Sequence, residues 1–99
     1  MTTLARLDAV LAPLPRVDLG AWPTPLVRLS RLGDALGIDV WVKRDDCSGL
    51  ALGGNKARKL EFVLAAAMTR GVRSIVTVGP VTSNHTMMTA AACRRLGLD

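Results

Sequence analysis

The chain has 99 residues, about half of them hydrophobic, and a formal net charge of +5. This length allows at most one small domain, and the apolar content excludes a disordered chain. Acidic and basic residues balance over residues 1–42, so the whole positive excess lies in residues 43–99. The cations there form short clusters without interleaved aromatic residues, which fits a small anionic ligand at least as well as a nucleic acid.

Cysteine usage and the N-terminus set the expected compartment. Cys47 and Cys93 lie far apart without metal-ligand spacing, so we predict free thiols in a reducing compartment and no metal site. The first residues lack the apolar stretch of a signal peptide, and no window resembles a membrane span. We therefore expect a soluble cytoplasmic protein. A basic nucleic-acid-binding module, with steeply salt-dependent affinity, stays open as an alternative.

The first half of the chain predicts short elements separated by turns. Apolar residues at helical spacing predict a helix over residues 3–12, and prolines then predict an extended connector over 13–25. A short strand is expected at 26–29 and another at 39–43. Between them Ser30 is expected to cap a helix over 31–36 that ends at Gly37. The side chains expected to point inward from that helix are Leu32, Ala35 and Leu36.

The second half predicts longer elements. After a loop over 44–55, a helix is expected from about Lys56 to Arg70, followed by a strand at 74–78 whose β-branched run suggests cover on both faces. A last helix is expected from Thr82 or Ser83 to about Leu96. The side chains expected to be buried on the helix over 56–70 are Leu60, Val63, Leu64, Ala67 and Met68.

The order of strands and helices predicts a parallel α/β layer. The next parallel strand should begin at Leu98-Asp99, where the sequence stops. We therefore expect either a fragment of a longer enzyme or a truncated gene product, which would carry no activity.

The most informative stretch is 53–61, Gly-Gly-Asn-Lys-Ala-Arg-Lys-Leu-Glu. The two glycines permit close approach to a ligand, and Asn55 is a candidate N-cap that places Lys56 in the first helical turn. The positive helix end and the cations Arg58 and Lys59 favour a neutral lysine amine, the form that attacks a carbonyl. The alternative is a solvated basic helix start. A Walker A phosphate loop is excluded because Ala57 stands where its Ser or Thr would follow the lysine.

A second candidate is Thr82-Ser83-Asn84-His85, between an expected strand and an expected helix start. Unpaired N–H groups and the helix dipole suit a carboxylate or phosphate there, and Asn84 can donate to a phenolate. Ser83 could equally be no more than a helix cap. His85, the only histidine, is expected to be structural, as are the charge cluster 43–46 and the methionines Met87 and Met88.

Four segments occur in a familiar order: 24–26, 43–46, 53–61 and 83–85. With them the chain resembles the N-terminal third of the D-cysteine desulfhydrase and 1-aminocyclopropane-1-carboxylate deaminase family. The resemblance implies pyridoxal 5'-phosphate as cofactor and the three-layer parallel-sheet fold of tryptophan synthase β-like (fold type II) enzymes, incomplete here. It implies an N-terminal segment over 1–45 and the start of the lysine-bearing α/β unit over 46–99.

The resemblance also implies roles for individual residues. Lys56 matches the lysine that carries the cofactor and later moves protons, and Lys59 the lysine that neutralises the cofactor phosphate. Asn84 matches the asparagine that bonds the pyridine-ring hydroxyl, and Ser83 the serine that meets the substrate carboxylate, with a nucleophilic part in the deaminases. Thr82 and Met87 depart from the usual Gln and Arg.

The implied activity is a lyase or deaminase reaction on a small amino acid, by a cytoplasmic homodimer. A D-cysteine desulfhydrase would release pyruvate, ammonia and hydrogen sulfide. His85 after Ser83-Asn84 is more similar to the desulfhydrases, and 1-aminocyclopropane-1-carboxylate deaminase is the alternative. The phosphate loop, the partner of the pyridine nitrogen and a substrate-side tyrosine of relatives all lie beyond residue 99.

Overall fold

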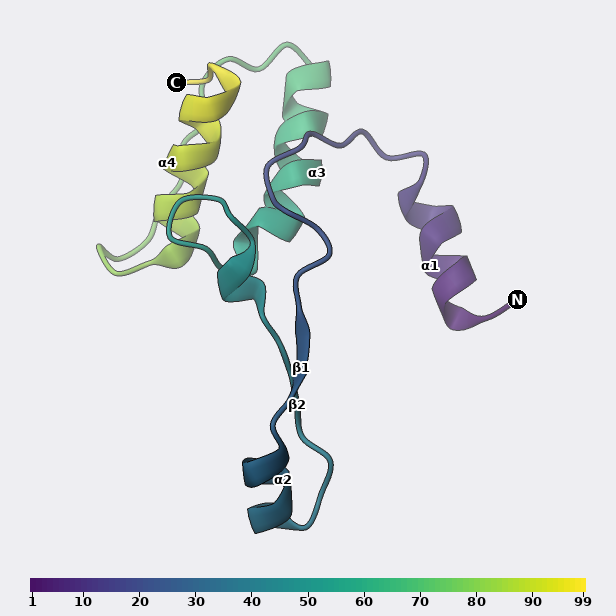
Figure 1. Ribbon diagram of the computed structural model, residues 1–99. Coiled ribbons are helices and arrows are strands. Elements are labelled where there is room, and N and C mark those ends of the chain that lie inside the picture. The colour runs from purple at the N-terminus through teal and green to yellow at the C-terminus, as the bar shows by residue number, and fades with distance from the viewer.

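The computed structural model describes residues 1–99 and divides into a body and a projecting arm (Figure 1). Its radius of gyration of 16.5 Å exceeds the roughly 13 Å of a compact chain of this size. The body consists of residues 16–25 and 44–99, and the arm of residues 26–43, while the N-terminal residues 1–15 belong to neither. The elements in chain order are α1 (Thr3–Leu11), β1 (Leu26–Arg28), α2 (Ser30–Leu36), β2 (Trp41–Lys43), the 3-10 turn η1 (Asp45–Cys47), α3 (Lys56–Thr69) and α4 (Asn84–Leu96).

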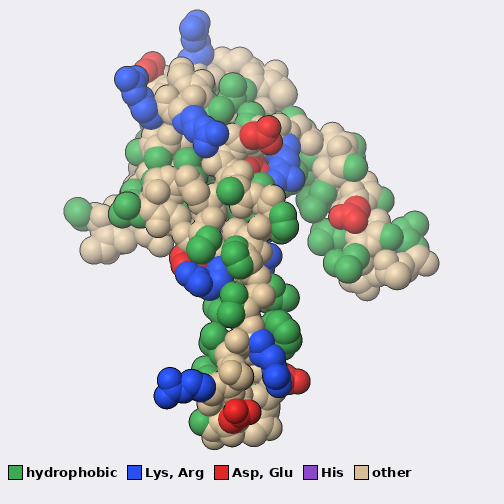
Figure 2. Space-filling model, in the orientation of Figure 1, with side chains coloured by type: hydrophobic (Ala, Val, Ile, Leu, Met, Phe, Trp, Pro, Cys, Tyr) green, Lys and Arg blue, Asp and Glu red, His purple; other side chains and the backbone are tan.

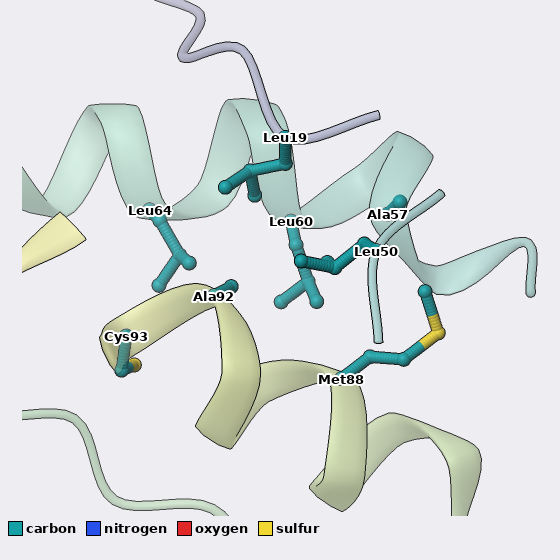
Figure 3. Close-up of a cluster of buried hydrophobic side chains, with 8 residues drawn as sticks. All are labelled: Leu19, Leu50, Ala57, Leu60, Leu64, Met88, Ala92 and Cys93. Atoms are coloured by element: carbon teal, nitrogen blue, oxygen red, sulfur yellow. The ribbon is translucent and has the colours of Figure 1, made fainter. Parts of the chain in front are cut away.

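The core of the body lies where α3 packs against α4 (Figure 3). Leu60 and Leu64 are buried, as the helical spacing predicts, but Val63 and Met68 are exposed. One face of α3 packs against its neighbours, so only its stripe at i, i+3, i+4, i+7 and i+8 is covered. The buried cluster consists of Leu19, Leu50, Ala57, Leu60, Leu64, Met88, Ala92 and Cys93.

The arm contains the two predicted strands and the helix between them, but the strands pair in the opposite direction to the one predicted. β1 and β2 are antiparallel, with Val27 opposite Val42, which contradicts the expected parallel layer. A parallel pair needs a crossover over the sheet face, whereas the seven-residue α2 lies at the end of the pair (Figure 1). Within the described residues the sheet is therefore two-stranded, not three-layered and parallel.

Helix α2 also departs from the prediction in its cap and its inward face. It begins at Ser30 itself, with Leu29 at the N-cap position and no side-chain cap. The side chains expected inward, those of Leu32, Ala35 and Leu36, are all exposed because no element covers them. The residue of α2 that is buried is Gly33, where a Cβ atom would come within 2.7 Å of the Ile38 carbonyl oxygen.

Residues 74–78 form no strand, which contradicts the prediction. Val76 is 92% exposed and Val78 89% exposed, so neither face is covered. A strand requires hydrogen-bonded neighbours along its length, and this segment pairs at one end only. There Asp99 donates its N–H to the Arg73 carbonyl and accepts from the Ile75 N–H, at 2.9 and 2.6 Å. The pattern of these two bonds is that of a parallel pair, but it does not extend into a strand.

The other predicted helices, the cap at Ser83 and the free thiols are confirmed. The helices over 3–12, 56–70 and 82–96 form within a residue or two of the predicted bounds, and Ser83 is the N-cap of α4. Both cysteines are free thiols, and burial raises the pKa of Cys93. The helices are all too short or too polar to cross a membrane.

Candidate functional site

The two motifs singled out in the sequence meet in the body. Lys56 is the first residue of α3 and Asn84 the first of α4. Between them lies Gly54, whose φ of 134° favours glycine. A Cβ atom on Gly54 would lie 3.0 Å from the Met88 sulfur and 3.6 Å from the Asn84 side-chain nitrogen. The loop that leads into Lys56 is thus in close contact with the start of α4.

The side chains of Lys56, Lys59 and Asn84 are unengaged. None of the three takes part in a hydrogen bond or an ion pair, whereas four arginines of the chain are ion-paired. Lys56 is half-buried, and Lys59 and Asn84 are exposed. Asn55 occupies the predicted N-cap position, but its side chain makes no cap hydrogen bond. Two ammonium groups and an amide therefore stand available to an anionic ligand with further acceptors.

Ser83 does act as a helix cap. Its hydroxyl accepts from the Thr86 N–H at 3.4 Å, which confirms the cap. The same oxygen lies against the backbone of Gly79, where a Cβ atom would come within 3.2 Å. Capping uses the hydroxyl as acceptor and leaves its proton available to a ligand.

The third cation of the first turn, Arg58, is fully engaged. Its guanidinium donates two hydrogen bonds of 2.7 Å to Asp45 and lies 4.4 Å from the centroid of the Trp22 ring. The hydrogen bonds from Arg58, and then the one from the Thr24 hydroxyl, hold the pKa of Asp45 well below its usual range. Asp45 in turn raises the pKa of Arg58.

Only some of the charged side chains at residues 43–46 pair with one another. Arg44 and Asp46 pair at 2.7 Å, and the guanidinium of Arg44 lowers the pKa of Asp46. Asp45, in contrast, reaches across to α3, and the Lys43 ammonium donates to the Thr24 carbonyl. This part of the sequence therefore braces the loop over 44–55 rather than closing on itself.

His85 makes two contacts near the start of α4. Its Nε2 lies 3.2 Å from the Thr77 hydroxyl, and its backbone carbonyl accepts from the Thr89 hydroxyl. Its Nδ1 is buried without a hydrogen-bond partner. Met88 is fully buried, as the prediction of core packing required, and Met87 is half-buried.

The part played by Glu61 is not predicted by the sequence patterns. Its carboxylate is fully buried and accepts from the Leu19 and Gly20 N–H groups, from the Trp22 indole and from Arg16. Burial alone would raise the pKa of Glu61, but these hydrogen bonds outweigh it and the pKa is lowered. The available signal was its position: residue 61 falls on the same helical stripe as Leu60 and Leu64.

The family assignment now follows from comparison with known proteins. The family described as "Pyridoxal-phosphate dependent enzyme" matches residues 17–99. The chain belongs to this family. The free donors and the glycine-lined contact between the starts of α3 and α4 fit its cofactor, which offers an aldehyde, a phosphate and a ring hydroxyl.

Individual relatives agree with this assignment. The chain is 53% identical over 92 residues to a D-cysteine desulfhydrase from Yersinia enterocolitica, covering 93% of this chain. It is 50% identical over 93 residues to a Pyrococcus abyssi protein provisionally named 1-aminocyclopropane-1-carboxylate deaminase, covering 94% of this chain. In each case it spans 28% of the relative's length.

A solved structure extends the comparison to three dimensions. The crystal structure of an "ACC deaminase homologue" matches all of this chain with a TM-score of 0.90 at 45% identity, and the match covers 30% of that chain. The likeness supports the fold type II assignment implied by the resemblance. The chain corresponds to a part of that fold that contains helices and a two-stranded sheet.

Proposed function

We propose that the chain bears the lysine side of a pyridoxal-phosphate-dependent lyase or deaminase that acts on a small amino acid. A D-cysteine desulfhydrase-like reaction, giving pyruvate, ammonia and hydrogen sulfide, is the function favoured. The observation that carries the proposal is the close approach of Gly54, two residues before Lys56, to the start of α4, where a Cβ atom added to Gly54 would lie 3.6 Å from the side-chain nitrogen of Asn84. Residues 46–99 are the start of the lysine-bearing unit in this proposal, and residues 1–45 the segment before it.

Each unengaged side chain has a matching group on the cofactor. Lys56 would hold the aldehyde carbon through its amine, and Lys59 would neutralise the phosphate. Asn84 would donate to the ring hydroxyl from the first turn of α4. The exposed position of Lys59, three residues after Lys56 and so on the same side of α3, suits a group that lies along the helix.

Bound pyridoxal phosphate supplies the electron sink that weakens the bonds to the amino-acid α-carbon. The chain supplies the proton transfers and the orientation. The Lys56 amine would take a proton from the substrate and return it. Ser83 would direct its hydroxyl proton to the substrate carboxylate while still accepting from Thr86.

The test is covalent labelling of Lys56. The complete gene product is incubated with pyridoxal phosphate, reduced with borohydride and mapped by peptide mass spectrometry. We expect the reduced cofactor on Lys56 and none on Lys59. Lys56→Ala should lose the label, whereas the exposed Arg70→Ala, at the other end of α3, should keep it. An unlabelled Lys56, or equal labelling of Lys59, would overturn the proposal.

The competing substrate is 1-aminocyclopropane-1-carboxylate, because relatives bearing that name match as closely as the desulfhydrases do. His85 after Ser83-Asn84 favours the desulfhydrase. Sulfide release from D-cysteine is measured beside ammonia release from 1-aminocyclopropane-1-carboxylate. Higher kcat/KM with D-cysteine is expected, and the reverse order would favour the deaminase. A labelled but inactive protein would instead match the product without activity.

The assembly and compartment are part of the same proposal. The free thiols Cys47 and Cys93 suit a reducing cytoplasm, and resemblance to the family suggests a homodimer. Light scattering during size-exclusion chromatography would test the dimer, and a monomeric mass at micromolar concentration would contradict it.

A further inference from the structure

The loop between η1 and α3 is held mainly by polar contacts. Of its residues, Leu50 joins the core, while Leu52 is exposed and Gly53 leaves no room for a side chain beside the Asp46 carbonyl. The position of the loop end, where Lys56 begins α3, therefore depends on hydrogen bonds more than on apolar packing.

Ser48 makes the most specific of these bonds. Its side chain is fully buried, and its hydroxyl donates to the Gly54 carbonyl at 2.8 Å while accepting from the Gly54 N–H at 3.1 Å. Both backbone groups of one residue are thus held by a single side chain. The Gly54 N–H also points to the Asp45 carbonyl at 2.8 Å, so the braced Asp45 supports the same residue.

Gly54 is the residue whose position matters for the site. Its backbone lies between the start of α3 and the start of α4. A Cβ atom added to Gly54 would lie 3.6 Å from the Asn84 side-chain nitrogen and 3.0 Å from the Met88 sulfur, which is closer than van der Waals contact. A shift of Gly54 would move Lys56, two residues later, relative to Asn84. Catalytic groups must be held to within about half an ångström, so the contact that fixes Gly54 has consequences for the chemistry.

We propose that Ser48 is a positioning residue for the pyridoxal-phosphate site: its hydroxyl fixes Gly54 and thereby sets the spacing between Lys56 and Asn84. The inference rests on the proposed function and deepens it. Ser48 touches neither cofactor nor substrate in this proposal, and it acts through the backbone of the loop.

The test is a graded series at Ser48 in the complete gene product. Ser48→Ala removes the hydroxyl, and Ser48→Cys replaces it by a weaker donor and acceptor of similar shape. We expect cofactor affinity to fall in the order Ser, Cys, Ala, with a dissociation constant about tenfold higher for Ser48→Ala, since one buried hydrogen-bond pair is lost. The visible absorption band of the bound cofactor should shift in the same order, while borohydride still labels Lys56.

The matched control is Thr89→Val, which removes another buried hydroxyl that donates to a backbone carbonyl, that of His85 at 2.7 Å. Both variants should lower the melting temperature, but Thr89→Val should leave the cofactor dissociation constant within about twofold. Equal affinity across the Ser48 series, or an equal loss in the control, would overturn the positioning role. If Ser48→Ala does not fold, the same comparison is made with Ser48→Cys. Unlabelled Lys56 in the wild type would instead reject the proposed function.

Discussion

The body and the arm use similar sequence patterns with opposite results. Both contain a leucine-bearing helix, yet α3 buries Leu60 and Leu64 whereas α2 leaves Leu32 and Leu36 exposed. Figure 2 shows hydrophobic side chains at the surface of the arm between charged ones. The difference is that α3 has α4 beside it, while α2 has no helix against it. Amphipathic spacing therefore predicts which face of a helix can be buried. That face becomes buried only where another element packs against it.

The polar contacts of the body are also more buried than those of the arm. The body holds Glu61 fully buried, with four hydrogen bonds to its carboxylate and an ion pair with Arg16. The ion pair of the arm, Arg28 with Asp39, is exposed on both sides. Buried networks contribute to stability far more than exposed pairs do. The body is thus the part that contains a buried polar network, and four predictions test its contrast with the arm.

The largest expected effect is that of Glu61→Ala. The N–H groups of Leu19, Gly20 and Trp22 would lose their acceptor, and the free energy of unfolding should fall by about 4 kcal/mol. Urea unfolding followed by circular dichroism measures it. The matched variant in the arm, Asp39→Ala, should leave the urea midpoint almost unchanged. A comparable loss from both substitutions would remove the distinction between body and arm.

Truncation of apolar side chains should separate the regions next. Leu64→Ala removes a fully buried side chain between α3 and α4, and we expect a loss of about 3 kcal/mol. Leu36→Ala, on the exposed face of α2, should change stability by less than about 0.5 kcal/mol. The same urea titration compares them, and a large effect of Leu36→Ala would show that the arm is packed against something in solution.

Cofactor binding should depend on cations of the body alone. Lys59→Ala should raise the dissociation constant of pyridoxal phosphate about tenfold, because one charge-assisted contact to the phosphate is lost. Arg31→Ala removes an exposed cation from α2 and should have no effect. Fluorescence titration with the cofactor gives both constants. Equal weakening by the two substitutions would indicate attraction by net charge rather than a site.

The smallest effect expected is a dependence of stability on pH. Glu61 has a lowered pKa in the folded chain, so its contribution is complete above the ordinary pKa of about 4.3 and is lost as the pH falls through the lower folded value. The urea midpoint should stay level from pH 7 to 5 and decline below about pH 4. Glu61→Gln, which cannot ionise, should give a flatter curve over the acid range, and a parallel curve would exclude Glu61 as a cause.

Much of the local structure could be predicted because it depends on neighbours in the sequence. The bounds of α3 and α4, the cap at Ser83 and the loop over 44–55 follow from spacing, capping and glycine. The failures share one cause. The wrong predictions concern the burial of Val63, the strand at 74–78 and the direction in which β1 pairs with β2. Each of these depends on which segment lies alongside, and apolar or β-branched composition does not specify that neighbour.

For the candidate site, the sequence by itself determined which chemical groups are present: the amines of Lys56 and Lys59, the hydroxyl of Ser83 and the amide of Asn84. These are the groups that we propose bind the cofactor and the substrate. Only the tertiary structure decided which cations are free. Arg58 forms an ion pair with Asp45, which lies 13 residues earlier in the sequence. Its neighbours Lys56 and Lys59 form no ion pair or hydrogen bond. The reason is physical: side-chain type fixes what a group can bind, but ion pairs and loop contacts such as that of Ser48 with Gly54 form only when distant segments meet.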